Sequence, residues 1–372
     1  MSIIFHITTT NAYFEAKKRN EYTHESLIRE NFIHCSRHYQ VSDVANYIFK
    51  GQKNLILLAI DESKVKHEIK YEGPSWNTFP HIYGPLNLDA VINTFDFLEL
   101  TDGFELPIEA LELVVESLSK HSSGPLYKDS RHYDAMNNPE GSDVGFYVEQ
   151  ATKKSGEVLD LACGSGRFSI PIARKGLKVT GLDLSSTMLN LAKNKAQSAG
   201  FDIDFILGDI RLFNLNKKFD FIFCGFNSSQ HLHEEKEFRS FLDCVKQHLK
   251  SDGLFVFDIF NPSISMLNRN SSERYLVSKY KDPDDGQEIS VWEFPSYNPA
   301  KQLSSFRFIY EKNDKMLFEE RFSLRNYFPL EMDVLLRNCG FDILNKYGTY
   351  KQDAFQGQSM KQIFICRVGK QV

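Results

Sequence analysis

Three acidic residues stand at the ends of successive apolar segments in the middle of the chain. Asp160 and Asp183 each end an apolar run, and Asp209 follows a third one. Continuous apolar runs separated by amphipathic stretches of about 10–15 residues predict parallel strands covered on both faces by helices. The carboxyl ends of such strands meet at one edge of the sheet, where open α/β sheets bind ligands. We therefore expect the three carboxylates to lie in a row along one ligand-binding crevice.

A glycine turn follows the first carboxylate. Gly164 and Gly166 flank Ser165, and glycine lets the backbone pass close to a ligand. A dinucleotide fingerprint would place a third glycine where this chain has Ser169, and it does not normally carry an acid just before the loop. The chain also lacks the GxxxxGK[ST] sequence of phosphate-binding loops. The turn is therefore not predicted to hold a pyrophosphate.

The positions of the carboxylates indicate an adenosyl ligand with a cationic end. Asp160, four residues before Gly164, suits an ammonium group. Asp183, 19 residues after Gly164, is spaced as a carboxylate that accepts hydrogen bonds from ribose hydroxyls. Asp209 and its apolar neighbour Ile210 suit an adenine amino group and ring. This combination favours S-adenosylmethionine as the cofactor, and each acid taken alone would more often be a solvated loop residue.

Four segments resemble the successive motifs of the class I S-adenosylmethionine-dependent methyltransferases. They are DLACGSG at 160–166, GLDLSSTML at 181–189, GDI at 208–210 and FDFIFC at 219–224. The resemblance covers about residues 126–368. It implies backbone contacts to the cofactor in the glycine turn, packing against it by the residues after Asp183, and a tyrosine brought over it from the N-terminal side. The residues expected to bind the cofactor are Tyr133, Asp160, Ala162, Cys163, Gly164, Gly166, Asp183, Leu184, Met188, Asp209, Ile210 and Phe226. For Tyr133, ordinary packing is the alternative.

The pattern changes to period two after Pro262. Phe306, Phe308 and Tyr310 share one face of a predicted strand, and turn residues lie at 282–286, 295–299 and 312–314. These features predict an antiparallel sheet inserted at about 263–326. With FDIFN at 257–261 before it, the insert is similar to that of a bacterial subgroup of small-molecule methyltransferases. Its aromatic residues are expected to form the sheet core, or in part an apolar lid over the acceptor.

The predicted fold class is α/β. A Rossmann-like, seven-stranded methyltransferase sheet with an inserted antiparallel β subdomain is expected at 126–372, with its last helix at 329–338 and a final strand at 361–368. Residues 1–105 are expected to form a small α+β domain. The sequence HSSGP at 121–125 breaks a helix-like stretch, so we place a linker at 106–125.

Residues that could touch the methyl acceptor follow the fourth strand. Phe226 would flank the methionine part of the cofactor, and Asn227 and His231 could orient an acceptor. His231 as a general base is a hypothesis, and a capping or surface histidine is the more common outcome. The pair formed by His231 and His233 has no carboxylate or cysteine partner at clear ligand spacing, so no metal is expected.

Three blocks in the first hundred residues resemble a bacterial domain family without an assigned function. They are FHITT at 5–9, NFIHCS at 31–36 and FPHIYGPL at 79–86. That family has been suspected of kinship with ADP-ribosyltransferases and RNA 2′-phosphotransferases. The analogy implies a polar cleft, although no glutamate is firmly placed as a catalytic acid and hydrogen-bonded core histidines are the alternative. The residues expected in that cleft are His6, His34, Ser36, His81 and Tyr83.

The composition of the chain indicates which classes of partner it binds and in which compartment it works. The 372 residues carry a net charge of -5, which provides no basic field for DNA, RNA or anionic lipid. No apolar run could cross a bilayer, the N-terminus does not read as a secretory signal, and the six scattered cysteines suit a reducing cytoplasm. We expect a cytoplasmic methyltransferase with a small-molecule acceptor. The alternatives are a non-catalytic S-adenosylmethionine sensor, or a bifunctional protein whose N-terminal domain acts on NAD or nucleotides.

Overall fold

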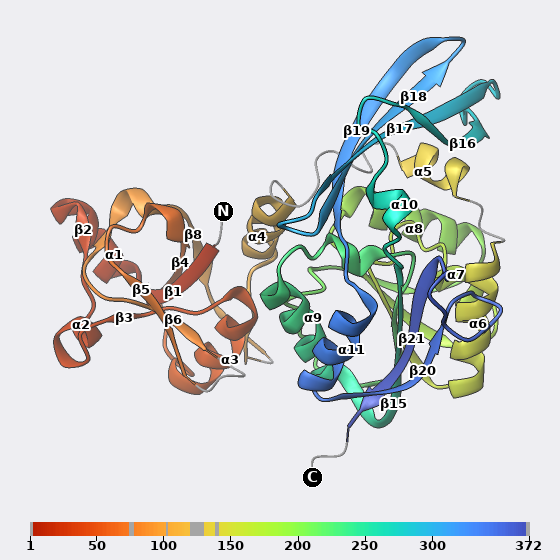
Figure 1. The fold of residues 1–372 in the computed structure, drawn as a ribbon. Coiled ribbons are helices and arrows are strands. Elements are labelled where there is room, and N and C mark those ends of the chain that lie inside the picture. Colours follow the sequence, from red (N-terminus) through yellow and green to blue (C-terminus); the bar gives the residue numbers. More distant parts are fainter. Residues whose placement is uncertain (1–2, 74–77, 102, 120–129, 138–140, 370–372) are drawn as a thin grey trace. The chain divides into compact units, whose positions relative to one another are not determined.

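The computed structural model describes residues 3–73, 78–101, 103–119, 130–137 and 141–369, so the HSSGP segment at 121–125 lies outside the described residues. The chain divides into two compact units, residues 1–121 and 122–372. Figure 1 shows both units, and each is described below by itself.

The first unit is built around a three-stranded antiparallel sheet. Strand β4 (Leu55–Asp61) pairs on one side with β1 (Ile3–Thr9) and on the other with β8 (Val91–Phe97). Helices α3 (His38–Ile48) and α4 (Ile108–Ser119) pack on one face of this sheet. Helix α1 and a group of short strands pack on the other. These elements are α1 (Thr10–Arg19), β2 (Glu21–Tyr22), α2 (Glu25–Arg29), β3 (Ile33–His34), β5 (Ile69–Glu72), β6 (Phe79–Ile82) and β7 (Leu86–Asn87). The short strands β9 (Glu99–Leu100) and β10 (Gly103–Phe104) pair with each other, and Phe104 packs on the first face, with α3 and α4. The predicted α+β class is confirmed.

The second unit contains the predicted seven-stranded sheet. Its strand order is β13-β12-β11-β14-β15-β21-β20, in which the first five strands are parallel and β21 runs antiparallel to both of its neighbours. The strands are β11 (Glu157–Leu161), β12 (Lys178–Asp183), β13 (Asp204–Leu207), β14 (Phe219–Cys224), β15 (Leu249–Phe260), β20 (Phe341–Tyr347) and β21 (Lys361–Val368).

Helices cover both faces of this sheet because its strands carry apolar side chains in both directions. Leu159 and Phe257 belong to the core on one face, whereas Val158 and Val256 belong to the core on the other. Helices α9 (Glu235–His248) and α11 (Pro329–Asn338) pack on the first face. Helices α6 (Ser142–Lys154), α7 (Ser169–Ala173) and α8 (Ser186–Ser198) pack on the second. No described helix is both long and apolar enough to span a bilayer.

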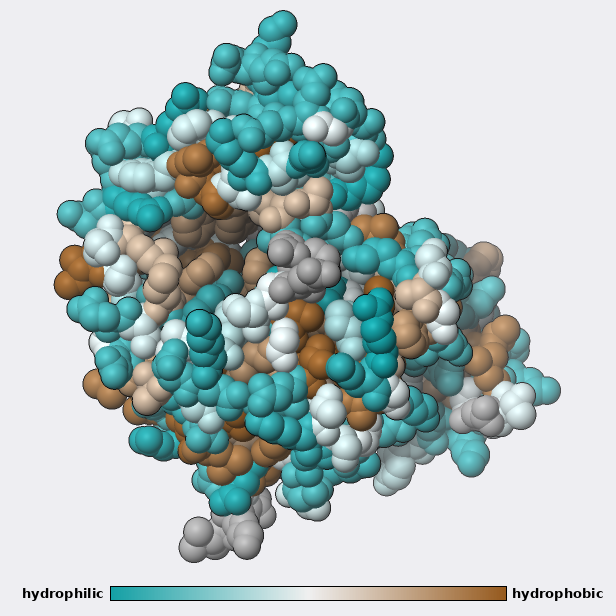
Figure 2. All heavy atoms as spheres, turned by 90° about the vertical axis from the view of Figure 1, so that its right-hand side faces the viewer, coloured by the Kyte–Doolittle hydropathy of each residue, from teal (hydrophilic) through white to brown (hydrophobic). Residues whose placement is uncertain are grey.

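A second, four-stranded antiparallel sheet is inserted between β15 and α11, and it projects from the α/β body in Figure 1. Its strands are β16 (Tyr275–Lys281), β17 (Glu288–Asn298), β18 (Leu303–Lys312) and β19 (Lys315–Arg325), and α10 (Ile264–Leu267) leads into it. In the space-filling view a recess opens below this projecting sheet, with apolar side chains around its rim (Figure 2).

The turn predicted at 295–299 is wrong, because β17 continues through it to Asn298. Proline cannot donate to a ladder, which is why Pro295 suggested a turn. The structure pairs β16 with β17 only as far as Glu293, so Pro295 has a neighbouring strand on one side alone. Pro295 therefore stands at an edge of the sheet, where a residue without an N–H is tolerated.

Candidate functional site

The glycine turn after β11 adopts a conformation that only a few residue types accept. Ala162, Gly164 and Gly166 all have positive φ, at 59°, 55° and 77°. A Cβ on Gly166 would stand 3.3 Å from side-chain atoms of Ile170 and Phe205, which leaves no room for a larger residue without adjustment. The turn therefore presents backbone rather than side chains at the carboxyl edge of the sheet.

Asp183 holds this turn in place. Its carboxylate accepts hydrogen bonds from the backbone N–H of Gly164 and of Ser185, both at 2.8 Å. Burial raises the pKa of Asp183, while these backbone donors stabilise its charged form. Ser185 also caps α8, as its spacing predicts, by accepting from the N–H of Met188. Leu184 and Met188 lie beside the same edge, Met188 buried and Leu184 half-buried.

Asp160 is fully buried below the turn. Its Oδ2 accepts a hydrogen bond from the Ser169 hydroxyl at 2.6 Å, whereas its Oδ1 has no partner within the described part of the chain. Burial raises the pKa of Asp160 to about 8, despite the hydrogen bond from Ser169. A buried carboxyl with an unused acceptor is suited to a cationic or hydrogen-bond-donating group, so this position fits the ammonium of the predicted cofactor, directly or through water.

Asp209 has a protein partner that the sequence did not suggest. It is buried, and its two carboxylate oxygens accept from Arg211 Nε at 3.0 Å and from the guanidinium NH2 at 2.6 Å. Arg211 in turn pairs with Glu237 on α9. Ile210 packs at the margin of the core. The carboxylate is thus fixed by an ion pair, and a role toward adenine would use the lone pairs that Arg211 leaves free.

A short helix near the start of the methyltransferase-like segment lies against the glycine turn. In α5 (Ser130–Met136), Asp134 accepts from the Ser165 hydroxyl and pairs with Lys195 of α8 at 2.6 Å. Tyr133 is half-buried next to this anchor, and burial raises the pKa of its phenol. The positive charge of Arg167 lowers the pKa of Tyr133, and the negative charge of Asp183 raises it by a smaller amount. The contacts of Asp134 and Lys195 carried no recognisable sequence signal.

A polar network supports the loop after β14. Phe226 and Asn227 both have positive φ, at 58° and 61°. The Phe226 N–H donates to Asp258 at 2.8 Å, and Lys361 Nζ donates to Asn227 Oδ1 at 2.5 Å and to Asp258 at 3.0 Å. Tyr147 also donates to Asp258, at 2.6 Å. Burial opposes ionisation of Asp258, but Lys361 and these donors together lower its pKa. In the sequence, this network is indicated only by an aspartate, Asp258, within the apolar FDIFN segment.

The two histidines after β14 have different surroundings. His231 is half-buried near the Phe322 ring, with 6.4 Å between ring centroids. Burial, and then the neighbouring His233, lower the pKa of His231 to about 4, so the ring is neutral at pH 7. His233 Nε2 donates to the Ser323 carbonyl at 3.0 Å and ties the loop to β19.

Neither histidine belongs to a metal-type cluster. Among the described residues, one group of three, His132, Asp282 and Asp284, brings metal-ligating atoms within 4.8 Å of one another. Its members are already bonded to protein groups: His132 to the Tyr280 hydroxyl, Asp282 to Lys312 and Asp284 to Arg131.

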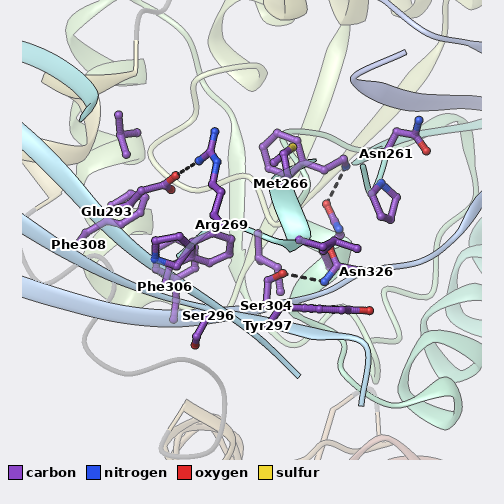
Figure 3. Close-up of a pocket in the computed structure, with 18 residues that line it drawn as sticks. Asn261, Met266, Arg269, Glu293, Ser296, Tyr297, Ser304, Phe306, Phe308 and Asn326 are labelled. Atoms are coloured by element: carbon purple, nitrogen blue, oxygen red, sulfur yellow. Dashed lines mark hydrogen bonds and ion pairs between the residues drawn. The ribbon is translucent and has the colours of Figure 1, made fainter. Parts of the chain in front are cut away.

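A cavity of about 180 Å³ lies between the inserted sheet and the carboxyl end of β15 (Figure 3). Phe306, Phe308 and Phe322 come from the sheet, while Phe260 and Met266 come from the end of β15 and from α10. The sequence pattern predicted that the aromatic residues of the sheet form its core or an apolar lid. In the structure several of them line a cavity. Gln230, next to His231, lines the same cavity. The cavity therefore borders the loop that carries Asn227.

In the first unit, the candidate histidines fall into two environments. His6 is 3% exposed, and both of its ring nitrogens are bonded, Nδ1 to the His34 carbonyl at 2.6 Å and Nε2 to the Tyr22 hydroxyl at 2.8 Å. Because a carbonyl only accepts, Nδ1 carries the proton of the neutral ring. Burial lowers the pKa of His6 to about 3. Ser36 is also buried, where its backbone pairs with Phe5.

The remaining members cluster around Phe32. His81 stacks on the Phe32 ring, with 4.0 Å between centroids, and its Nδ1 bonds Glu72 at 2.9 Å. The Tyr83 hydroxyl donates to the same carboxylate at 2.7 Å. The His34 ring lies 5.0 Å from that of His81, between centroids, because β3 and β6 pair these two residues in register.

Comparisons with known proteins agree with this geometry. Residues 158–253 match the family described as "Methyltransferase domain", a range that contains the glycine turn, Asp183 and Asp209. The putative methyltransferase YqeM of Bacillus subtilis is 27% identical over 232 residues, covering 61% of this chain and 90% of that protein. The glycine/sarcosine N-methyltransferase of Halorhodospira halochloris is 28% identical over 217 residues, covering 56% of this chain and 75% of that enzyme. The chain carries a methyltransferase domain.

Solved structures share the fold of the methyltransferase domain. One is an S-adenosylmethionine-dependent methyltransferase from Clostridium acetobutylicum, with a TM-score of 0.54, 22% identity and coverage of 66% of this chain and 96% of that one. Another is the CcbJ methyltransferase of Streptomyces caelestis, with a TM-score of 0.56, 20% identity and coverage of 64% and 96%. The predicted fold class is confirmed.

The first unit matches a different family. Residues 7–94 correspond to DUF952, a family described as of unknown function, as the three sequence blocks predicted. The suspected kinship with ADP-ribosyltransferases is not shown by these comparisons.

Proposed function

We propose that the methyltransferase domain transfers a methyl group to a small molecule bound in the cavity under the inserted sheet. The observation that carries this proposal is the position of that cavity. It is bordered by Phe260, at the carboxyl end of β15, and by Gln230, in the loop after β14. The glycine turn and Asp183 lie at the same edge of the sheet, since the parallel strands β11, β12, β14 and β15 all end there.

The cofactor-binding roles follow from the donors and acceptors at this edge. Asp183, which already holds the glycine turn, would accept from the ribose hydroxyls, and Asp160 would face the ammonium group with its unused Oδ1. Tyr133, Leu184 and Met188 would pack against the adenosyl group. Asp209 and Ile210 would border the adenine, and Phe226 the methionine chain.

When bound, S-adenosylmethionine supplies a sulfonium-activated methyl group that is transferred to a nucleophile. The protein therefore has to align the acceptor and exclude water. Asp258 and Lys361 fix the backbone and side chain of the Phe226–Asn227 loop, which leads to Gln230 in the cavity wall; Asn227 and His231 do not themselves line the cavity. His231 is neutral at pH 7, so its ring is able to accept a proton from an acceptor, although its low pKa makes it a weak base.

Relatives with named substrates support a small acceptor. Besides the glycine/sarcosine enzyme, they include an amino-sugar N,N-dimethyltransferase of Streptomyces fradiae, 31% identical over 119 residues, which cover 32% of this chain and 45% of that enzyme. Incubation of the full chain with methyl-labelled S-adenosylmethionine and a metabolite extract tests the proposal. We expect label in a low-molecular-weight product. Persistent absence of label, with cofactor binding intact, would favour the alternative of a non-catalytic sensor.

A separate activity of the first unit is the second candidate, favoured by the pairing of His81 with Glu72 beside His34. A histidine whose Nδ1 is bonded by a carboxylate keeps Nε2 for binding or proton transfer. Calorimetric titration of the full chain with NAD and with nucleotides tests this candidate. Binding that His81→Ala abolishes would support it, and no heat from any of these ligands would remove it.

A further inference from the structure

The cavity under the inserted sheet has the size of a single substituted ring. An engineered apolar cavity of about 150 Å³ accommodates benzene, and this cavity measures about 180 Å³. Its aromatic wall is formed by Phe306, Phe308 and Phe322, with Phe260 and Met266 contributing from the α/β body (Figure 3). Aromatic side chains gain from stacking or edge-to-face contacts with a ring, beyond the burial of apolar surface.

Two of the amides in the lining are engaged by the protein itself. Gln230 donates to the Arg325 carbonyl and accepts from the Phe260 N–H, both at 2.8 Å. Asn326 donates to the Ser304 hydroxyl at 2.8 Å (Figure 3). These two amides fix the cavity wall. Asn261 also lines the cavity, and its Oδ1 has no hydrogen-bond partner among the described residues, so this acceptor and the charged side chains are the groups that can discriminate between ligands.

The charges in the lining neutralise each other. Arg269 pairs with Glu293 at the end of the cavity near Phe308 (Figure 3). The Glu293 side chain is 12% exposed and that of Arg269 is 36% exposed. Burial raises the pKa of Glu293, and the attraction of Arg269 opposes this effect. Glu293 is thus the largely buried partner and Arg269 the exposed one, and a carboxylate that is already paired offers no free charge to a ligand.

A charged ligand would disturb this balance. A carboxylate bound to Arg269 would leave Glu293 without its partner, and an ammonium group bound to Glu293 would displace Arg269. The first outcome leaves the buried Glu293 carboxylate uncompensated in a largely apolar cavity. The second costs the ammonium group its hydration without adding an ion pair, because the exposed Arg269 side chain is released to solvent. A neutral hydroxyl or amine can instead hydrogen-bond to the edge of the intact pair.

We infer that the cavity binds an uncharged, single-ring aromatic compound bearing a phenol hydroxyl or an aromatic amine. This inference rests on the proposed function, in which the same cavity holds the methyl acceptor. It goes further by giving the acceptor's size, its aromatic character and its lack of charge.

Calorimetric titration of the full chain saturated with S-adenosylhomocysteine tests the inference with four probes of similar size. The probes are p-cresol, p-toluidine, benzoate and benzylamine, the last protonated at pH 7. We expect the two neutral probes to bind at least about tenfold more tightly than the two charged ones. Equal or tighter binding of either charged probe would overturn the inference, and so would the failure of both neutral probes to bind.

Charge-swapping variants sharpen the test. Glu293→Gln leaves Arg269 unpaired, so the preference should shift toward benzoate, whereas Arg269→Gln should shift it toward benzylamine. Glu319→Gln, on β19 and outside the cavity lining, is the matched control and should keep the wild-type preference. If both cavity variants keep that preference as well, the ion pair does not select the ligand and the inference fails.

A second pair of variants addresses the aromatic wall. Phe308→Leu should weaken p-cresol binding several-fold, and Phe318→Leu, which alters a ring stacked on Tyr310 outside the lining, should not. Thermal denaturation shows whether each variant is folded, and Phe322→Leu replaces Phe308→Leu if the latter is not. Equal effects of the lining and control variants would contradict the aromatic site. Failure of the wild type to bind S-adenosylhomocysteine would instead overturn the proposed function.

Discussion

The Asp183 carboxylate accepts a hydrogen bond from the Gly164 N–H at 2.8 Å, across 19 residues of sequence. One side chain at the end of β12 thereby fixes the backbone turn after β11. The same carboxylate keeps lone pairs that can meet ribose hydroxyls, so it links the shape of the turn to cofactor binding.

Replacing Asp183 should therefore lower the affinity for the cofactor by more than the loss of a single contact would. We expect Asp183→Ala to lose charge-assisted hydrogen bonds of about 1.5–3 kcal/mol, which is more than tenfold in affinity for S-adenosylmethionine. Calorimetry on the full chain measures this, with Asp204→Asn on the exposed start of β13 as the control. Unchanged affinity in Asp183→Ala would refute the ribose assignment.

Cofactor binding should release a proton from Asp160. In the free protein burial raises its pKa to about 8, so at pH 7 the carboxyl is mostly protonated, and a cationic ligand favours its ionised form. Calorimetry at pH 7 in buffers of different ionisation enthalpy counts the released protons. We expect a fraction approaching one in the wild type and a clearly smaller fraction in Asp160→Asn. Equal proton release from both would separate Asp160 from the ammonium site.

The same pKa predicts how stability varies with pH. A carboxyl whose folded-state pKa lies above its ordinary value of 3.8 favours the folded state only while it is protonated. Its contribution is therefore lost as the pH rises from about 4 to about 8. In the cofactor-free protein, the melting temperature of Asp160→Asn should rise relative to that of the wild type as the pH is raised from 5 to 8. A constant difference across this range would contradict the assignment.

Lys361 should matter mainly through Asp258. Removing one partner of a buried ion pair costs about 3–5 kcal/mol, because the remaining charge is left uncompensated, and Asp258 is fully buried here. We expect Lys361→Met to lower the melting temperature strongly and Asp258→Asn to recover part of the loss in the double variant. Lys351→Met, at an exposed position, is the control. Additive effects of the two substitutions would show that the pair is not coupled.

His6 should stay neutral under all ordinary conditions. Burial lowers its pKa to about 3, and its Nδ1–H donates to the His34 carbonyl. Nitrogen NMR of the imidazole should show one Nδ1–H tautomer that does not titrate between pH 8 and pH 5. For a histidine with a lowered folded-state pKa, stability falls as the pH drops from 6.5 toward 3, since unfolding then takes up a proton. Titration of His6 near pH 6 would contradict the buried network.

Elements with strong local patterns were predictable from the sequence. Strand β21 and helix α11 have the predicted bounds, because each is an apolar or amphipathic run closed by polar or helix-breaking residues. The order of acids along the sheet edge also followed from the strand periodicity.

Contacts between distant residues were not predictable in the same way. Asp258 joins Tyr147 and Lys361, which lie 111 and 103 residues away, and Asp143 pairs with Arg167 through a bidentate bond of 2.6 and 3.0 Å. The sequence around a lysine or a tyrosine does not indicate which distant residue its side chain contacts. The turn predicted at 295–299 was wrong for a related reason, since only the strand pairing shows that Pro295, which has no N–H, has a neighbouring strand on one side alone.

A crystal structure of the full chain with bound S-adenosylhomocysteine tests the central claim most directly. The account predicts ribose hydroxyls within hydrogen-bonding distance of Asp183, the ammonium group facing Asp160, and the sulfur directed toward the cavity lined by Phe260 and Gln230. A ligand bound away from the glycine turn, or a sulfur facing away from that cavity, would contradict it.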